Sequence, residues 1–583
     1  MPMIKRLSKC IREYKKASIL TPLFVSLEVV MEVIIPYYMG KMLDYGVNLG
    51  DMNYIVKVGI MLVVFCIMSL VFGALAGKYA AYASAGFSKN LRHDMFHNVQ
   101  SFSFSNIDKF SVSSLVTRLT TDVTNMQNAY QMIIRIAVRS PLMIVFSLVM
   151  AIRISPRLSL IFLCVLPLLA LGLYYIVTHA HPIFERVFKT YDKLNNIVSE
   201  NLHGIRVVKS FVREEHEKEK FNSVSDKIYK DFVSAEKLLA FNAPLMQTAA
   251  YATMLLISWF GAKLIVSTGN VPEAGLTTGD LVILMTYAMQ ILMNLMMLSM
   301  IFVMITMSRA SAERISEVLS EESSLKNPKN PVMEVKDGSV EFDNVGFSYK
   351  NDVNKLCLKD ASFKIKSGET VGIIGSTGSS KSTLVQLIAR LYDVTTGSVK
   401  VGGVDVRDYD LDTLREKVAM VLQKNVLFSG TIKENLRWGN PNATDEEMKE
   451  ACVLAQADSF IQTFEKGYDT YIEQGGTNVS GGQKQRLCIA RSLLKKPKIL
   501  ILDDSTSAVD TQTDALIRKG FADYIPETTK IIIAQRISSI EHADKIIVLD
   551  DGKIENIGTH EELLGKDPIY TEVYNSQTKG GKA

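Results

Sequence analysis

Long apolar stretches alternate with polar stretches in the first half of the chain. About 20 mainly apolar residues are needed to cross the hydrocarbon core of a bilayer as a helix. Six stretches meet or approach that length, at residues 18–39, 55–80, 136–155, 157–178, 240–266 and 280–308. The pattern therefore predicts an α-helical transmembrane domain with six membrane helices, which we assign to residues 1–320.

The segments between these helices alternate in length and charge. Two of them, residues 82–135 and 179–239, are long, polar and rich in Lys and Arg, whereas the others are short. Because positively charged loops tend to stay on the cytoplasmic side, we expect both long segments and both termini to be cytoplasmic. Their helical periodicity predicts long extensions of the membrane helices into the cytosol. Residues 113–123 and 204–211 within them are either solvated turns or short helices that dock on a cytosolic domain.

The hydrophobic pattern changes after residue 320. Residues 321–337 form a polar, proline-bearing linker, and residues 338–583 follow as a separate domain. In "ETVGIIGSTGSSKSTLVQLIARLY" a hydrophobic strand enters a glycine-rich turn and leaves as a helix. That context is typical of a phosphate-binding loop, so the second half is predicted to be an α/β P-loop domain.

The glycine-rich turn carries candidate nucleotide-binding residues. Backbone N–H groups of such a loop cradle phosphate oxygens, while Lys381 would reach the outer phosphates and the Ser382 hydroxyl would ligate Mg²⁺. The pattern G-x-x-x-x-G-K-[ST] fails only at Ser380, where a side chain replaces the second glycine and is expected to crowd the loop. The candidates are Gly375, Ser376, Gly378, Ser379, Ser380, Lys381, Ser382 and Thr383.

Composition agrees with a membrane protein and limits its partners. The 583 residues are 48% hydrophobic, and the mean hydropathy is +0.14, which is high for a soluble chain of this size. The net charge of +4 is small, and no basic block requires a nucleic acid, so none is expected as a partner. The six cysteines show no CxxC spacing, which predicts reduced thiols without a disulfide or a zinc site.

Three motifs and six membrane helices together carry a resemblance. The phosphate loop, "VSGGQKQR" at residues 479–486 and "ILILDDSTSAVD" at residues 499–510 resemble those of an ABC exporter half-transporter. The resemblance covers essentially the whole chain. It implies a dimer in the plasma membrane of a bacterial cell, with two ATP molecules between two nucleotide-binding domains. It also implies that 113–123 and 204–211 are coupling helices.

The resemblance also implies roles for individual residues. Tyr349 matches the aromatic residue that stacks on adenine, although it could also be an ordinary strand-edge tyrosine. Asp503 matches the carboxylate that binds Mg²⁺, together with Ser382, and Gln423 matches the glutamine that senses Mg²⁺ and the attacking water. Asp510 matches the loop between the two sites. The signature motif, which faces the ATP of the other subunit, corresponds to Ser480, Gly481, Gly482 and Gln483.

Two positions depart from the family pattern. Asp504 stands where the family has a catalytic glutamate, and Gln535 stands where it has a histidine. A catalytic group misplaced by about 1 Å can lose on the order of a hundredfold in rate, and glutamine cannot carry the charge of histidine. With an intact signature motif, this predicts the slow-site subunit of a heterodimer. The alternatives are a homodimer with two slow sites, a regulatory ATP-locked subunit or an importer with an exporter fold.

The membrane helices contain candidate substrate residues. Glu28 and Glu32 share one helix face, and they are either a cation-attracting patch or a structural pair bonded to neighbouring helices. Arg135 and Arg139 are expected to anchor lipid headgroups at the cytoplasmic interface. Met289, Met293 and Met300 belong to a stripe that suits either ordinary packing or an adaptable cavity. The substrate class, a small molecule, a lipid or a peptide, stays open.

Overall fold

The chain divides into two compact units. The structure is a computed structural model that describes residues 2–270, 275–505 and 509–579. Unit 1 comprises Met1–Gln100 and Val112–Glu321, and unit 2 comprises Ser101–Ser111 and Glu322–Ala583. The chain therefore divides near residue 320, except that the short segment 101–111 also belongs to unit 2.

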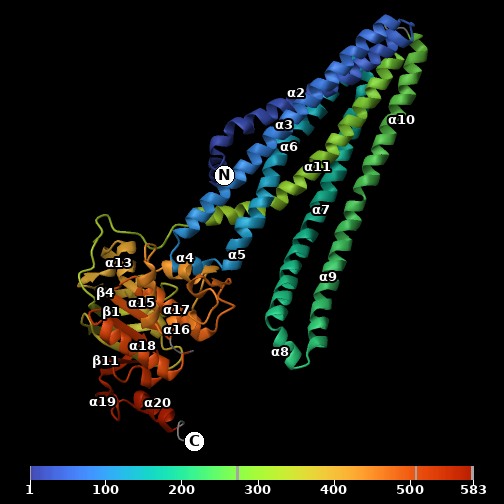
Figure 1. Cartoon of the computed structure of the whole chain (residues 1–583). Helices are drawn as coiled ribbons and strands as arrows, with labels where there is room; N and C mark the ends of the chain where they lie inside the picture. Colours follow the sequence, from blue (N-terminus) through green and yellow to red (C-terminus); the bar gives the residue numbers. More distant parts are fainter. Residues whose placement is uncertain (1, 271–274, 506–508, 580–583) are drawn as a thin grey trace. The chain divides into compact units, whose positions relative to one another are not determined.

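Unit 1 is built of long helices (Figure 1). Its α-helices are α1 (Pro2–Lys9), α2 (Lys15–Met42), α3 (Met52–Gln100), α5 (Val112–Thr117), α6 (Val123–Ile154), α7 (Pro156–His203), α8 (Ile205–Ser210), α9 (Glu214–Ala240), α10 (Asn242–Thr268) and α11 (Thr278–Ser320). Among the described residues, six helical stretches are long and apolar enough to cross a membrane: Arg12–Val47, Met52–Gln100, Val112–Ile154, Pro156–His203, Glu214–Ser267 and Thr278–Ile301. The prediction of six membrane helices is confirmed.

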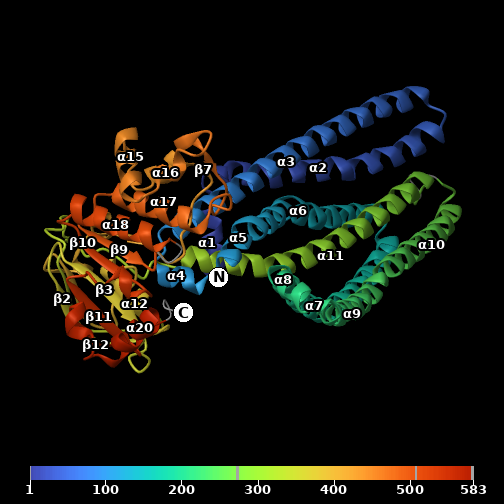
Figure 2. The same cartoon turned by 60° about the horizontal axis from the view of Figure 1, so that its bottom comes forward.

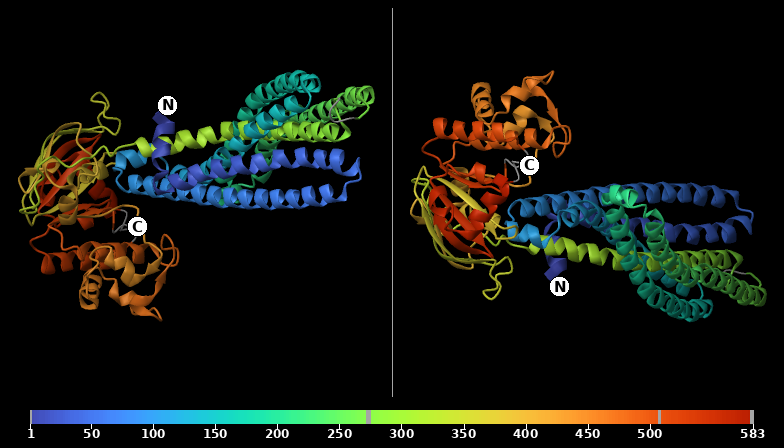
Figure 3. Two further views of the ribbon diagram at one scale, coloured as in Figure 1. Left: turned by 90° about the horizontal axis from the view of Figure 1, so that it is seen from above. Right: turned by 90° about the horizontal axis from the view of Figure 1, so that it is seen from below.

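The long helices of unit 1 pack in neighbouring pairs. α2 lies beside α3, and α7 lies beside α9 and α10, with the short α8 at their turn (Figures 1 and 3). A buried apolar core joins α2 to α6 and α11, and it includes Val29, Ile283 and Tyr287. The Tyr287 hydroxyl donates a hydrogen bond to the Val33 carbonyl oxygen (2.7 Å), which satisfies the one polar group of that core side chain.

The short helix α4 (Phe104–Lys109) lies in the first half of the sequence but packs within unit 2. Asp108 of α4 accepts a hydrogen bond from the Tyr392 hydroxyl (2.7 Å), and Phe104 meets the Tyr392 ring edge-on. Residues 113–123, which the sequence suggested for docking, lie in unit 1, as part of the predicted membrane domain, and continue as helix into α6. A capping box between Ser103 and Asn106 starts α4, a signal too short for helical periodicity to reveal.

Unit 2 is an α/β domain, as predicted (Figure 2). Its strands are β1 (Val340–Phe347), β2 (Leu358–Ile365), β3 (Thr370–Gly375), β4 (Thr396–Val401), β5 (Val404–Asp405), β6 (Val418–Val421), β7 (Gly430–Thr431), β8 (Tyr471–Ile472), β9 (Ile499–Asp503), β10 (Thr529–Ile533), β11 (Lys545–Asp550) and β12 (Lys553–Gly558). Its further helices are α12 (Lys381–Ile388), α13 (Leu411–Lys417), α14 (Ile432–Arg437), α15 (Asp445–Leu454), α16 (Asp458–Ile461), α17 (Gly481–Leu493), α18 (Thr511–Tyr524), α19 (His560–Leu563) and α20 (Pro568–Lys579).

The central sheet of unit 2 has six strands in the order β12-β11-β3-β10-β9-β6. β11, β3, β10, β9 and β6 run parallel, and β12 pairs antiparallel at one edge. The strands β9 and β10 are buried along their whole length, as expected for parallel strands covered on both faces. An antiparallel sheet, β2-β1-β4-β5, forms a second layer.

Candidate nucleotide-binding site

Four neighbouring parallel strands deliver the candidate site residues to one edge of the sheet. The phosphate loop follows β3, Gln423 follows β6, Asp503 and Asp504 end β9, and Gln535 follows β10. Because ligands of open α/β sheets bind outside the carboxyl ends of the strands, this edge is the expected binding site. Residues up to 160 positions apart in sequence are therefore brought together by strand order.

The phosphate loop has the backbone that a phosphate cradle requires. Gly375 has φ +155° and Gly378 has φ +89°, conformations that side chains disfavour. A Cβ atom on Gly378 would meet nothing within 4 Å, so the loop is open there and fits the phosphates of a nucleotide. The Lys381 ammonium donates to the carbonyl oxygens of Gly375 (2.9 Å) and Ser376 (2.7 Å). Burial lowers the pKa of Lys381, despite the nearby carboxylates.

Ser380 occupies the glycine position without crowding the loop. Its φ of +69° lies in the left-handed region, which costs a non-glycine residue about 1 kcal/mol. Its hydroxyl donates a hydrogen bond to the Cys357 carbonyl oxygen (2.7 Å), outside the phosphate loop. The Ser380 side chain therefore makes a hydrogen bond where crowding of the loop was expected, and this bond offsets the backbone strain.

We expect Ser380→Ala to lower the free energy of unfolding by about 1 kcal/mol, because the strain stays while the hydrogen bond is lost. Ser380→Gly is expected to be nearly neutral, since it removes the strain and the bond together. The thermal unfolding of unit 2 in the purified full-length protein measures both. Equal destabilisation by the two variants would contradict this account.

Asp503 and Ser382 form a pair of oxygen ligands suited to Mg²⁺. The Ser382 hydroxyl donates to Asp503 Oδ1 (3.0 Å), and Asp503 is almost fully buried at the end of β9. Burial raises the pKa of Asp503, and the neighbouring Asp504 raises it further, while the Ser382 hydrogen bond opposes both. A divalent cation would offset the free-energy cost of keeping the buried Asp503 carboxylate charged, because it would pair with that carboxylate.

Asp504 is held by two glutamine side chains. Gln535 Nε2 donates to Asp504 Oδ2 (2.7 Å), and Gln423 also hydrogen-bonds the carboxylate. Asp504 has φ +49°, an uncommon backbone conformation for this residue type. Burial raises its pKa, whereas the two amide hydrogen bonds lower it. The three catalytic candidates of the sequence therefore meet at one carboxylate.

Tyr349 lies beside the phosphate loop. Its hydroxyl is 2.9 Å from Thr383 Oγ1, and its ring is edge-on to Phe347 and Tyr392. About half of the residue is exposed (51%), so one ring face is accessible. This exposure suits a stacking residue better than a strand-edge tyrosine that is fully packed.

The signature motif begins α17. Ser480 is the N-cap residue and forms a capping box with Gln483, so the Gly481 and Gly482 backbone lies at the helix N-terminus. An open hollow of about 330 Å³ is lined by Ser480, Gly481, Gly482, Arg486, Val509 and Asp510. Asp510 caps α18 by accepting a hydrogen bond from Thr513 N (2.9 Å). The hollow brings the signature motif and Asp510 together.

In the membrane domain, Arg139 pairs with Glu32 and is not a headgroup anchor. Arg139 Nη2 donates to both carboxylate oxygens of Glu32 (2.6 and 2.7 Å), and Arg139 Nε lies 3.9 Å from Glu28. The expectation that Arg139 anchors lipid is thereby corrected, because an arginine at this depth is stabilised by a carboxylate on a neighbouring helix. Glu28 is buried, and within the described residues its Oε2 has no hydrogen-bond partner.

Three methionines of the α11 stripe are not packed into the core of the chain itself. Met289, Met293 and Met300 are exposed by 43%, 65% and 67%. Such exposed apolar side chains on a membrane helix are available to lipid, to a partner subunit or to a substrate. Ordinary packing within the chain does not account for these three residues.

Comparisons with known proteins match both units. The family described as ABC transporter transmembrane region matches residues 18–323, and the family described as ABC transporter matches residues 358–507. The chain is 37% identical to the uncharacterized ABC transporter ATP-binding protein YfiB of Bacillus subtilis, over 94% of each chain. It is 36% identical to the uncharacterized ABC transporter ATP-binding protein Rv1273c of Mycobacterium tuberculosis, over 99% of this chain and 98% of the relative.

A solved structure agrees with this assignment. The structure of a bacterial Atm1-family ABC exporter with ATP bound matches with a TM-score of 0.79 and 25% identity, covering 97% of this chain and 98% of that one. Membrane region and ATP-binding domain are thus matched in order along one chain. The protein belongs to the ABC transporter family, as an exporter-type half-transporter that spans the membrane six times and carries its own ATP-binding domain.

Proposed function

We propose that this chain is the slow-site subunit of a heterodimeric ABC exporter. The observation that carries the proposal is the hydrogen bond between Gln535 and Asp504, in a site that keeps its binding elements. Asp504 is one methylene shorter than the family's glutamate, and a neutral amide donates to it where an imidazole is usual. Since phosphoryl transfer depends on positioning and charge, this site would bind ATP and hydrolyse it slowly.

In this proposal the binding residues keep their usual tasks. Tyr349 stacks on adenine, the N–H groups of the phosphate loop and Lys381 bind phosphates, and Asp503 with Ser382 binds Mg²⁺. Mg²⁺ supplies charge neutralisation at the phosphates. Gln423 and Gln535 orient Asp504, which polarises water poorly.

The same chain would complete a faster site on its partner. The N-terminus of α17 presents backbone N–H groups of Gly481 and Gly482 beside an open hollow, an arrangement that favours phosphate oxygens. We propose that the hollow receives the γ-phosphate of the ATP held by the partner. Asp510, in the same hollow, lies where it can sense that occupancy.

Two short helices are proposed to couple ATP binding to transport. α4 contacts Tyr392, whose ring meets Tyr349, so a movement of α4 would reach the adenine-stacking residue. α8 exposes Val207 and Phe211 by 60% and 73%. We propose that this apolar face of α8 docks on the nucleotide-binding domain of the partner subunit.

Native mass of the tagged chain, purified in lipid from the cell that makes it, tests the assembly. A complex with a second, different half-transporter is expected. A mass of twice 64.9 kDa would show a homodimer, and Asp504 would then be the working carboxylate of both sites.

We propose that Glu28 makes the transport pathway selective for cations, because Arg139 donates its hydrogen bonds to Glu32 and lies farther from Glu28, at 3.9 Å. Within the described residues, Glu28 Oε2 has no hydrogen-bond partner. Glu28→Gln is expected to reduce transport of cationic compounds about tenfold, equivalent to about 1.4 kcal/mol, and to spare neutral ones. Paired uptake assays in inverted vesicles, with one cationic and one neutral dye, measure the difference.

Glu32→Gln provides the matched control. It removes the carboxylate to which Arg139 is hydrogen-bonded and leaves only the longer contact with Glu28, so it is expected to destabilise the protein by about 3 kcal/mol and to reduce transport of both classes. If Glu28→Gln also lowers both classes equally, Glu28 is structural and the cation preference is refuted.

A further inference from the structure

The last helix, α20, bonds to the segment that carries Gln535. Gln577 Nε2 donates to the Gln535 carbonyl oxygen (2.8 Å), and Gln577 Oε1 accepts from the Ile537 N–H (2.9 Å). One planar amide therefore holds both ends of a three-residue stretch of backbone. Its donor and its acceptor are used at the same time.

This contact supplies a cap that the segment lacks. The 3₁₀-helix η6 (Ile537–Ser539) follows Arg536, whose side chain makes no capping hydrogen bond within the described part of the chain. The first N–H groups of a helical turn have no partner inside the turn. Gln577 provides that partner for Ile537, while Ser539 at the other end bonds to Asp514 (2.9 Å).

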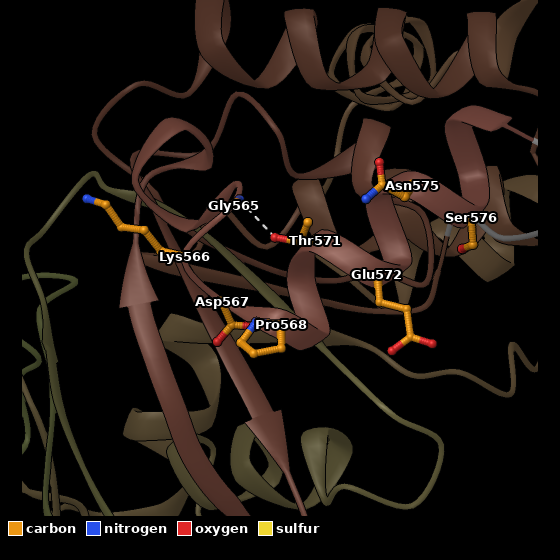
Figure 4. Close-up of a pocket in the computed structure, with 8 residues that line it drawn as sticks. All are labelled: Gly565, Lys566, Asp567, Pro568, Thr571, Glu572, Asn575 and Ser576. Atoms are coloured by element: carbon orange, nitrogen blue, oxygen red, sulfur yellow. Dashed lines mark hydrogen bonds between the residues drawn. The ribbon is translucent and has the colours of Figure 1, made fainter.

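α20 is anchored well enough to act as a fixed support. Tyr570 is fully buried, its hydroxyl lies 2.7 Å from His560 Nδ1, and its N–H donates to Asp567 Oδ1 (2.7 Å). Asn575 and Ser576, the residues just before Gln577, line a separate open hollow of about 600 Å³ (Figure 4). Gln577 therefore differs from its neighbours in bonding to the segment after β10.

We infer that Gln577 is a positioning residue of the nucleotide site. It holds the backbone of Gln535, and the side chain of Gln535 donates to Asp504 (2.7 Å). Loss of the Gln577 contact would loosen Gln535 beside Asp504, so α20 determines how firmly the site holds its nucleotide. The inference rests on the proposed function only in assigning Gln535 and Asp504 to that site.

Hydrogen exchange in the purified, nucleotide-free transporter tests the contact directly. In Gln577→Ala, the Ile537 amide is expected to lose about fivefold to tenfold of its protection, the effect of one hydrogen bond. Gln577→Glu keeps the acceptor for Ile537 and removes the donor to Gln535, so Ile537 stays protected. Ser576→Ala is the matched control, because the Ser576 hydroxyl donates to the Val573 carbonyl oxygen within α20 (2.8 Å). Unchanged exchange at Ile537 in Gln577→Ala overturns the inference.

The release rate of labelled ATP tests whether the contact acts through Gln535. Both Gln577→Ala and Gln577→Glu are expected to speed release about fivefold to tenfold, and neither should add to the effect of Gln535→Ala. Full additivity in the double variant would assign Gln577 a purely structural role. The exchange result is independent of the partner's identity, so it stands or falls separately from the heterodimer proposal.

Discussion

Asp504→Glu combined with Gln535→His is expected to raise the rate of ATP hydrolysis at this chain's own site by about a hundredfold. The longer side chain carries its carboxylate about one methylene closer to the attacking water. The imidazole can hold a positive charge or pass a proton, which the Gln535 amide cannot. Single-turnover hydrolysis of labelled ATP measures the gain, in a complex whose partner site has been inactivated at its catalytic carboxylate.

The single variants serve as controls. Gln535 and Asp504 are directly bonded, so the effects of the two substitutions should not be additive. If the double variant hydrolyses ATP faster and also transports more substrate, the native site is an ordinary catalytic site that turns over slowly. Faster hydrolysis without additional transport identifies a regulatory site, and an unchanged rate would show that the two residues do not limit the chemistry.

Strand order explains why the residues of a candidate nucleotide site could be picked out from the sequence. Gln423, Asp503 and Gln535 each follow a short apolar run, and parallel strands bring such positions to one edge. The local signals were also sufficient for the N-terminus of α17, where Ser480 and Gln483 form a capping box. At these positions the residue type, together with the strand or helix next to it, is enough to pick out the candidate site residues.

Contacts between distant side chains could not be predicted in this way. Glu32 and Arg139 are 107 positions apart, and Gln577 and Gln535 are 42 apart. No periodicity or motif spacing links such pairs, because the packing of whole helices creates them. The pair in the membrane explains why Arg139 was misassigned to the lipid interface, and α4 was missed because one capped turn has no repeating pattern.

Gly482→Asp is expected to lower the total ATPase of the transporter by more than about a hundredfold, the scale on which one misplaced or repelling group acts in phosphoryl transfer. Gly482 lies at the N-terminus of α17, whose N–H groups and dipole favour an anion. A carboxylate there would repel the γ-phosphate of the partner's ATP and occupy the hollow beside Asp510. Steady-state ATPase of the purified complex measures the loss.

Lys381→Ala distinguishes the two sites of the dimer. It removes the ammonium from this chain's own phosphate loop and leaves the hollow beside α17 intact. In a heterodimer whose turnover occurs at the partner's site, Lys381→Ala should reduce ATPase only a few-fold, far less than Gly482→Asp. In a homodimer every site needs both residues, so the two losses would be equally severe. The ratio of the two effects therefore reports which subunit's phosphate loop supports turnover.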